Sequence, residues 1–173
     1  AELKRMVVEM ARYKYNAIHL HLVDDQAWRI EIKKYPRLVA ESSQRPAMDD
    51  MQYTSPGFYT QDEMRELVAF AAKHHIMVIP EIEMPGHEVA AIHAYPQLTV
   101  GNKKVDVRTT SGVSNNLLNP ASEFTYQFLF DVFDELATVF PAPYVHLGGD
   151  EAGNPPLDDW TTDSACIALK EKL

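Results

Sequence analysis

Hydrophobic positions follow a helical period in three stretches of the chain. Between Glu2 and Tyr13 apolar residues recur every three or four positions, which predicts a helix with one buried face. The same spacing returns after Thr60, where Thr60 and Glu63 have the spacing of a capping box. It returns again after Asn119-Pro120, which we expect to be the cap and first turn of a third helix. A fourth helix is predicted over 162–173.

Short apolar runs follow the first three helices and predict strands over 17–23, 76–84 and 144–147. Helices that alternate with strands imply parallel strands joined by helical crossovers. Residues 26–59, with prolines at 36, 46 and 56, are irregular by composition and predict a long loop of the kind found in binding sites. The alternation fits either a doubly wound sheet or part of a (β/α)8 barrel.

Polar residues stand at the end of each predicted strand. They are Asp24 and Asp25, the segment 81–87, and Asp150 with Glu151. Barrels draw their sites from the carboxyl ends of several strands, so a barrel is favoured, although a doubly wound sheet also binds ligands there. A complete barrel needs about 250 residues, and this chain has 173. We therefore expect a single α/β unit over residues 1–173 that is a fragment of a (β/α)8 TIM barrel.

Composition excludes several classes of function. The formal net charge is −9 and no basic run is present, so neither nucleic acid nor an anionic membrane is an expected partner. No apolar stretch approaches the roughly 20 residues of a membrane span. Cys166 is the single cysteine, which excludes an intrachain disulfide and a cysteine-based zinc cluster.

Adjacent acids in "HLGGDE", residues 146–151, are the most informative pattern. Neighbouring side chains on a strand point to opposite faces, so Asp150 and Glu151 reach one pocket only if the pleat breaks, which Gly148 and Gly149 allow. Two close carboxylates take up protons at different pH, so one stays charged while the other donates. Glycosidic cleavage needs that division. The alternative is a loop cap or an exposed surface pair.

Three further patterns have both a functional and a structural interpretation. His19 and His21 share a strand face and could hold a metal, but they lie inside the strand, which favours hydrogen bonding in the core or behind the site. His87 follows a Met-Pro-Gly turn and could orient an acid. Trp28 and Trp160 could stack on sugar rings, although packing beneath a loop is favoured for both.

Three ordered segments resemble the catalytic barrel of glycoside hydrolase family 20, the β-N-acetylhexosaminidases. They are "HLHLVDDQAWRIEI", "FYTQDEMRELVAFAAKHHIMVIPEIEMPGH" and "YVHLGGDE". The resemblance implies about strands 2 to 4 of the barrel with their helices, the first and later strands being absent. It also implies hydrolysis of terminal non-reducing N-acetyl-D-hexosamine residues by a substrate-assisted retaining mechanism. The fragment is expected to be inactive alone.

The resemblance also implies roles for particular residues. Asp150 would orient the acetamido nitrogen of the substrate, and Glu151 would protonate the leaving oxygen and then activate water. His87 and Asp24 would support Glu151, and His146 would belong to the wall beneath. No metal and no organic cofactor are implied. Two departures from the family pattern are Ala27 in place of glycine and Glu83 in place of aspartate.

Partners and compartment follow from the same resemblance. N-acetylated amino-sugar glycans or oligosaccharides are the expected partners, and an extracytoplasmic setting (periplasmic, secreted or lysosome-like) is suggested. The sequence does not decide between glucosamine-type and galactosamine-type sugars.

Two other hypotheses stay open. One is a metal-dependent barrel hydrolase that uses His19, His21, His87 and Asp150. The other is a non-catalytic half-barrel that associates with itself through exposed sheet edges.

Overall fold

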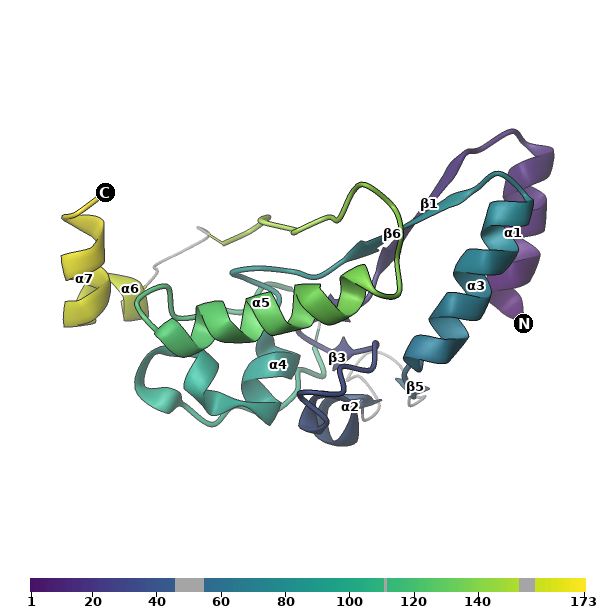
Figure 1. The fold of residues 1–173 in the computed structure, drawn as a ribbon. Coiled ribbons are helices and arrows are strands. Elements are labelled where there is room, and N and C mark those ends of the chain that lie inside the picture. The colour runs from purple at the N-terminus through teal and green to yellow at the C-terminus, as the bar shows by residue number, and fades with distance from the viewer. Residues whose placement is uncertain (46–54, 111, 153–157) are drawn as a thin grey trace.

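Two parallel strands form the centre of the chain (Figure 1). The structure is a computed structural model and describes residues 1–45, 55–110, 112–152 and 158–173. Strand β1 (Ala17–His21) pairs with β6 (Met77–Glu81) in register from Ala17 opposite Met77 to His21 opposite Glu81. The alternation of helices and parallel strands predicted from the sequence is confirmed for this pair.

The third predicted strand, 144–147, continues the parallel order but is wrong as a full strand. It pairs with β6 through one parallel bridge, Glu81 to His146. The amide of His146 donates to the carbonyl of Pro80 (3.0 Å), and the amide of Met84 donates to that of Leu147 (3.1 Å). Val145 and Leu147 stay exposed because the described residues cover neither face of this segment. Because segment 144–147 pairs only with β6 among the described residues and none of their side chains packs over it, it forms few backbone hydrogen bonds to its neighbour.

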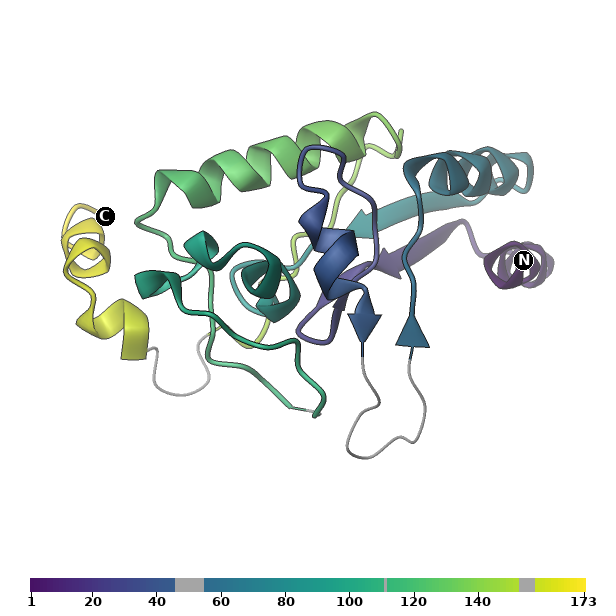
Figure 2. The same cartoon turned by 90° about the horizontal axis from the view of Figure 1, so that it is seen from below.

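Helices α1 (Glu2–Arg12) and α3 (Gln61–Lys73) lie side by side at one end of the molecule (Figures 1 and 2). The period predicted their buried faces in part. Val7, Met64, Leu67 and Ala71 are buried as predicted and Gln61 is buried in addition, but Leu3, Met10, Ala11 and Val68 are only partly buried and Met6 is 44% exposed. The predicted capping box of α3 is confirmed, since Thr60 accepts from the amide of Glu63 and the Glu63 carboxylate accepts from the amide of Thr60.

The third helix, α5 (Glu123–Ala137), begins later than predicted, with Ser122 as its N-cap. Asn119 does not cap the helix, because its side chain accepts from the amide of Ala121 (2.9 Å) and closes a turn before it. The inward positions of α5 include Phe128, Val132 and Leu136, which are buried as expected. Phe124 and Phe133 of the same helix are only partly buried.

The segment 26–59 is more regular than its composition predicted, in its described part. Strands β2 (Val23–Asp24) and β3 (Ala27–Trp28) form a tight antiparallel hairpin. Helix α2 (Arg37–Ser42) follows, and β4 (Gln44–Arg45) pairs with β5 (Ser55–Pro56). The proline at 46 lies outside the described residues.

Trp28 packs inside the molecule, as favoured from the sequence. It is fully buried, donates from Nε1 to the carbonyl of Ile30 (2.6 Å), and meets the ring of Phe128 edge-on. Its indole therefore offers no face to a sugar in this chain.

The chain after β6 builds the opposite end of the molecule. Helix α4 (Val89–Ala94) and the short 3-10 turns η1 (Pro96–Leu98) and η2 (Val100–Asn102) precede α5. The predicted helix over 162–173 is confirmed as α7 (Ser164–Lys170), with shorter bounds, and the short helix α6 (Asp158–Thr162) precedes it. Asp163 separates the two helices, because its side chain caps α7 by accepting from the amides of Ala165 and Cys166. Trp160 donates from Nε1 to the carbonyl of Leu118, which holds α6 against the preceding loop.

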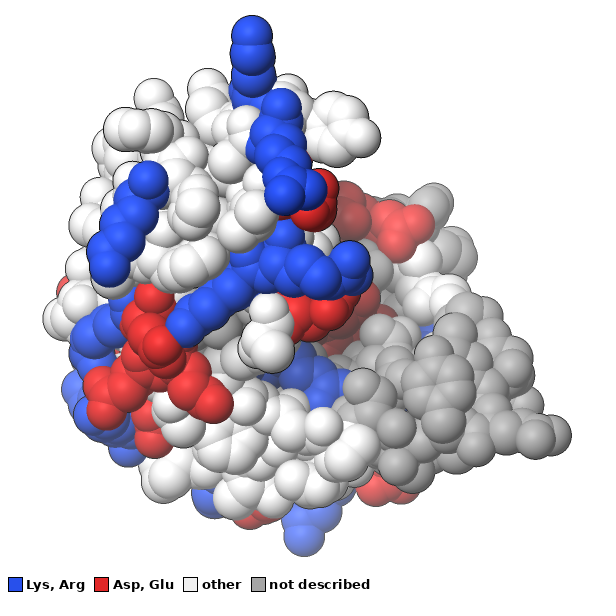
Figure 3. Space-filling model, turned by 90° about the vertical axis from the view of Figure 1, so that its right-hand side faces the viewer, with Lys and Arg blue, Asp and Glu red and all other residues white. Residues whose placement is uncertain are grey.

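The charged side chains on the face that carries α1 and α3 are mixed in sign (Figure 3). Lys4 pairs there with Glu66 at 2.5 Å, and Arg12 pairs with Glu9 at 2.9 Å. This face therefore does not present the one-signed basic surface that nucleic acid needs. None of the helices in the described part of the chain combines the length and hydrophobicity that a bilayer crossing requires.

Candidate active site

The turn that carries the adjacent acids leaves the extended conformation, as the two glycines predicted. Gly148, Gly149 and Glu151 have positive φ angles of 64°, 94° and 52°. Only glycine adopts such angles readily, so the sequence Gly-Gly permits the turn here. Gly148 is also required by space, since a Cβ on it would lie 1.6 Å from Oε2 of Glu83.

His87, which follows β6, brings together the acids from the ends of the other two predicted strands. Its Nε2 lies 3.2 Å from Oε2 of Glu151 and 3.6 Å from Oδ2 of Asp150. Its Nδ1 lies 3.1 Å from Oδ1 of Asp24. The turn before it packs closely on the acid turn, because a Cβ on Gly86 would be 3.5 Å from the carbonyl oxygen of Asp150. The structure thus joins four of the five residues selected from the sequence.

Asp24 and Asp25 are separated in function by the β2–β3 hairpin. Asp24 accepts from the amide of Asp25 at 2.6 Å, and the same oxygen faces His87. Asp25 turns inward, is fully buried, and accepts from the amide of Val89 at 3.3 Å. Burial raises the pKa of Asp25, and the bond from Val89 opposes that shift. Asp24 therefore faces His87 at hydrogen-bonding distance, whereas Oδ2 of the buried Asp25 lies 3.9 Å from the same ring nitrogen.

The outer side of the acid pair is open. The side chains of Asp150 and Glu151 are 63% and 47% exposed, while that of His87 is 11% exposed. A substrate can approach the carboxylates from solvent while the imidazole behind them stays shielded. The expectation that the two acids have unlike proton affinities stays a prediction.

His146, the fifth selected residue, lies beneath the acid turn and does not contact either acid in the described contacts. Its Nδ1 lies 2.7 Å from Oε1 of Glu81 and accepts from the amide of Gly148 at 3.0 Å. Glu81 also meets Nε2 of His19 at 2.5 Å through its second oxygen. This placement agrees with a residue that shapes the wall under the turn.

The His-x-His strand is matched by a Glu-x-Glu strand, a pattern that the sequence interpretation missed. His19 meets Glu81, and Nε2 of His21 lies 3.0 Å from Oε1 of Glu83. The expected core location of the histidines is wrong, because both side chains are 46% exposed. They project from the side of the sheet that the described residues leave uncovered. The alternating positions 19/21 and 81/83 on neighbouring strands were the signal for this pairing.

Two further buried acids lie behind the site. Glu83 and Glu88 are both sealed from solvent, and neither Glu88 oxygen has a hydrogen-bond partner among the described residues. Burial raises the pKa of Glu88 well above its ordinary value, and the charges of Glu83 and Asp25 add to the shift. Burial likewise raises the pKa of Glu83 to about 8, with contributions from a hydrogen bond with Glu81 and from nearby acids. Glu83 therefore holds a proton near neutral pH, and burial favours the neutral form of Glu88.

Several donor groups lie close enough to surround a metal ion. The sets are His19 with Glu81 and His146, His21 with Glu81 and Glu83, Asp24 with Asp25 and His87, and His87 with Asp150 and Glu151. In each set a histidine already faces a carboxylate at hydrogen-bonding distance. Such groups of side chains are common without an ion, so their proximity alone assigns no metal site.

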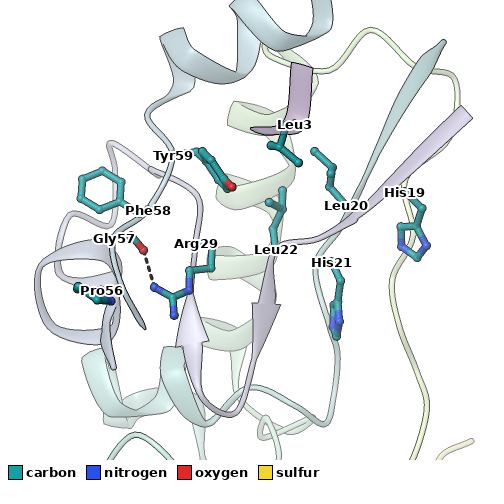
Figure 4. A pocket seen from close by; sticks show the side chains of 10 residues that line it. All are labelled: Leu3, His19, Leu20, His21, Leu22, Arg29, Pro56, Gly57, Phe58 and Tyr59. Carbon is teal, nitrogen blue, oxygen red and sulfur yellow. Dashed lines mark hydrogen bonds between the residues drawn. The ribbon is translucent and has the colours of Figure 1, made fainter. Parts of the chain in front are cut away.

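A separate cavity of about 470 Å³ lies along β1 and is lined from both faces of that strand, by His19 and His21 as well as by Leu20 (Figure 4). Leu20, Leu22 and residues 56–59 line it, and Arg29 donates to the carbonyl of Gly57 at 2.6 Å in its wall. None of the acids around His87 lines this cavity. The candidate active site is therefore the open cluster at the strand ends and not this cavity.

Comparison with known proteins decides the family. The model of the glycosyl hydrolase family 20 catalytic domain matches residues 1–173. The chain belongs to glycosyl hydrolase family 20. A beta-hexosaminidase of Porphyromonas gingivalis is 46% identical over 165 residues, which cover 95% of this chain and 21% of that protein.

Solved structures agree with this assignment to family 20. A crystal structure of a beta-N-acetylhexosaminidase superposes with a TM-score of 0.92 at 41% identity, covering 99% of this chain and 36% of that one. A mutant Streptomyces plicatus beta-hexosaminidase in complex with its product GlcNAc gives 0.83 at 37% identity, covering 99% and 32%. The chain thus spans about a third or less of the family 20 proteins that it matches. These similarities do not favour the metal-dependent hydrolase or the non-catalytic half-barrel.

Proposed function

We propose that this chain supplies the catalytic acids of a β-N-acetylhexosaminidase, and that the complete protein containing it removes terminal non-reducing N-acetyl-D-hexosamine residues. The observation that carries the proposal is the bridge made by His87, which meets Glu151 through one ring nitrogen and Asp24 through the other. A histidine held by one acid and facing a second is suited to orient a general acid. Family membership supplies the substrate class.

The proposed reaction is substrate-assisted and retaining. The acetamido oxygen of the substrate attacks the anomeric carbon, the glycosidic bond breaks, and Glu151 gives its proton to the departing oxygen. Water then attacks the same carbon, gives a proton to Glu151, and opens the oxazolinium ring to regenerate the acetamido group. Asp150, beside Glu151, accepts a hydrogen bond from the acetamido N–H in both steps and stabilises the positive charge on the ring. No metal or organic cofactor takes part.

Placement in a larger barrel is part of the proposal. Three parallel segments in chain order, with their sites at the carboxyl ends, fit about strands 2 to 4 of a (β/α)8 barrel. The open faces of Asp150, Glu151, His19 and His21 are where the other strands would enclose a sugar. We therefore expect the isolated chain to hydrolyse no substrate, because positioning supplies much of the rate. Self-association of the isolated chain stays a prediction that sedimentation would check.

The test uses the complete protein with two substrates. p-Nitrophenyl N-acetyl-β-glucosaminide should be hydrolysed, and the matching β-glucoside, which lacks the acetamido group, should not. NMR should show the β-anomer of the sugar as the first product. Equal rates on both substrates, or first formation of the α-anomer, would overturn the substrate-assisted mechanism.

A further inference from the structure

Glu83 stands directly against the turn that carries the catalytic acids. We propose that Glu83 is a positioning residue for this turn, and that its carboxyl group holds the Gly148 backbone in the conformation that aims Asp150 and Glu151 into one site. This inference rests on the proposed function. It assigns a task to a buried acid that the proposed chemical steps do not use.

The contact with Gly148 is the first support. The hypothetical Cβ of Gly148 would fall 1.6 Å from Oε2 and 2.4 Å from Cδ of Glu83, so the carboxyl group fills the space that any other residue would need. The amide of Gly148 is fixed separately by His146. Gly148 is therefore held by one contact to its amide and by a second to its α-carbon. An aspartate at position 83 would be one methylene shorter and would leave the second contact unmade.

The hydrogen bonding of Glu83 is the second support. Its Oε1 faces Nε2 of His21 at 3.0 Å, which fixes the carboxyl group from β1. Its Oε2 is buried and has no hydrogen-bond partner among the described residues. The carboxyl group is thus oriented by one oxygen and pressed against the turn by the other.

The protonation state follows from the surroundings of Glu83. The acids that act on it are Asp24 from the hairpin, Glu81 from its own strand and Asp150 from the turn, and Glu88 lies behind it; His21 is the facing imidazole. With a pKa of about 8, Glu83 is neutral at neutral pH. Above that pH it would place a new negative charge beneath Asp150. The support that it gives the turn should then weaken.

The experiment compares Glu83→Asp and Glu83→Gln in the complete protein, with Glu88→Gln as the matched control. Glu83→Asp should lower kcat/KM for the N-acetylglucosaminide about 10- to 100-fold, the cost of a misplaced group, while thermal unfolding shows an intact fold. Glu83→Gln has the shape and the neutral charge of the protonated acid. It should restore the rate near pH 6 to within about threefold.

The pH profile separates positioning from a merely structural role. Above pH 8 one more group should ionise in the parent than in Glu83→Gln, namely Glu83 itself. The activity of the parent should therefore fall more steeply with pH in this range. Glu88→Gln, which neutralises a neighbouring buried acid without touching Gly148, should keep the parental rate and the parental fall above pH 8. If Glu83→Asp keeps the parental kcat/KM, the contact between Glu83 and Gly148 does not position the turn. If activity of Glu83→Gln falls as steeply above pH 8 as that of the parent, the Glu83 carboxyl group is not the group that ionises there. If Glu88→Gln loses the steep fall in activity above pH 8, the additional ionisation belongs to Glu88 and not to Glu83. A parent inactive on the substrate would overturn the proposed function instead.

Discussion

Two groups of acids meet at the strand ends, and they differ in their contact with water. Asp24, Asp150 and Glu151 surround His87 on the open side and are at least partly exposed. Asp25, Glu83 and Glu88 lie behind them and are sealed from solvent. Desolvation raises the pKa of each buried acid. The same functional group therefore lies open on one side, where we propose that it exchanges protons, and is sealed on the other, where burial favours its neutral form.

Adjacent residues fall on opposite sides of this boundary. Asp24 and Asp25 are neighbours in sequence, yet one faces His87 and the other accepts a backbone amide in the interior. His87 and Glu88 are divided in the same way. For these acids, a raised pKa therefore goes with burial of the side chain and not with position along the chain. Substitutions that remove one charge at a time test this division.

The largest effect is expected for Glu151→Gln in the complete protein. An amide cannot donate the proton that the departing oxygen needs, and a general acid contributes about 100- to 10,000-fold to rate. kcat/KM for the p-nitrophenyl N-acetylglucosaminide should fall by that factor while the melting temperature stays close to the parental one. A variant with near-parental rates would remove Glu151 from the role of acid and base.

Asp150→Asn should have the next largest effect, confined to N-acetylated substrates. The variant keeps the shape but loses the charge that stabilises the ring formed by the acetamido group, for which about 100-fold is expected. kcat and KM for the N-acetylglucosaminide should be measured separately, and the loss should lie in kcat, because the charge that Asp150 stabilises forms only during the reaction. A loss confined to KM would assign Asp150 a different role.

His87→Ala should lower kcat/KM by about 10- to 100-fold, because Glu151 loses the group that orients it. The pH dependence of kcat/KM should shift as well, since the charge network through Asp24 is broken. His93→Ala is the matched control, because His93 is also partly buried but meets only the carbonyl of Val105 among its described hydrogen bonds. An equal loss in both variants, with an unshifted profile, would indicate a structural role for His87.

The order and direction of the main elements could be predicted because each depends on local pattern. The helical period gave α1 and α3, and the capping box fixed the start of α3. The start of α5 was missed because it depends on which backbone amide the side chain of Asn119 accepts from. The short helix α6, which precedes the predicted fourth helix, was missed as well. The segment 144–147 was overestimated because an apolar run does not show whether a neighbour covers it.

The residues of the site could be predicted where they follow a predicted strand and have side chains suited to acid–base chemistry. His87, Asp24, Asp150 and Glu151 were selected from the sequence, and the structure brings them together. The buried acids were missed because burial is a property of the fold and not of the motif. Glu83 was noticed only as one methylene more than the family pattern has, and the sequence does not show that this methylene reaches Gly148.

The smallest expected effect is on stability and comes from Glu88→Gln. The folded chain keeps the Glu88 proton, whereas the unfolded chain releases it near the ordinary value of 4.5. Because the folded state binds the extra proton, the free energy of unfolding falls as pH rises above that value. The variant lacks this loss, so its melting temperature should equal the parental one near pH 4 and exceed it increasingly toward pH 8.

Glu66→Gln is the control for that stability measurement, because Glu66 is an exposed acid paired with Lys4. Its pKa is lowered by Lys4, so the pair stabilises the fold above the ordinary pKa, and removing it should slightly lower the melting temperature at pH 8. The two glutamine variants should thus move in opposite directions as pH rises. If Glu88→Gln instead melts below the parent at pH 8, the buried carboxyl group of Glu88 is ionised and has a partner. Burial would then not keep Glu88 neutral, and the distinction between open and sealed acids would not hold for it.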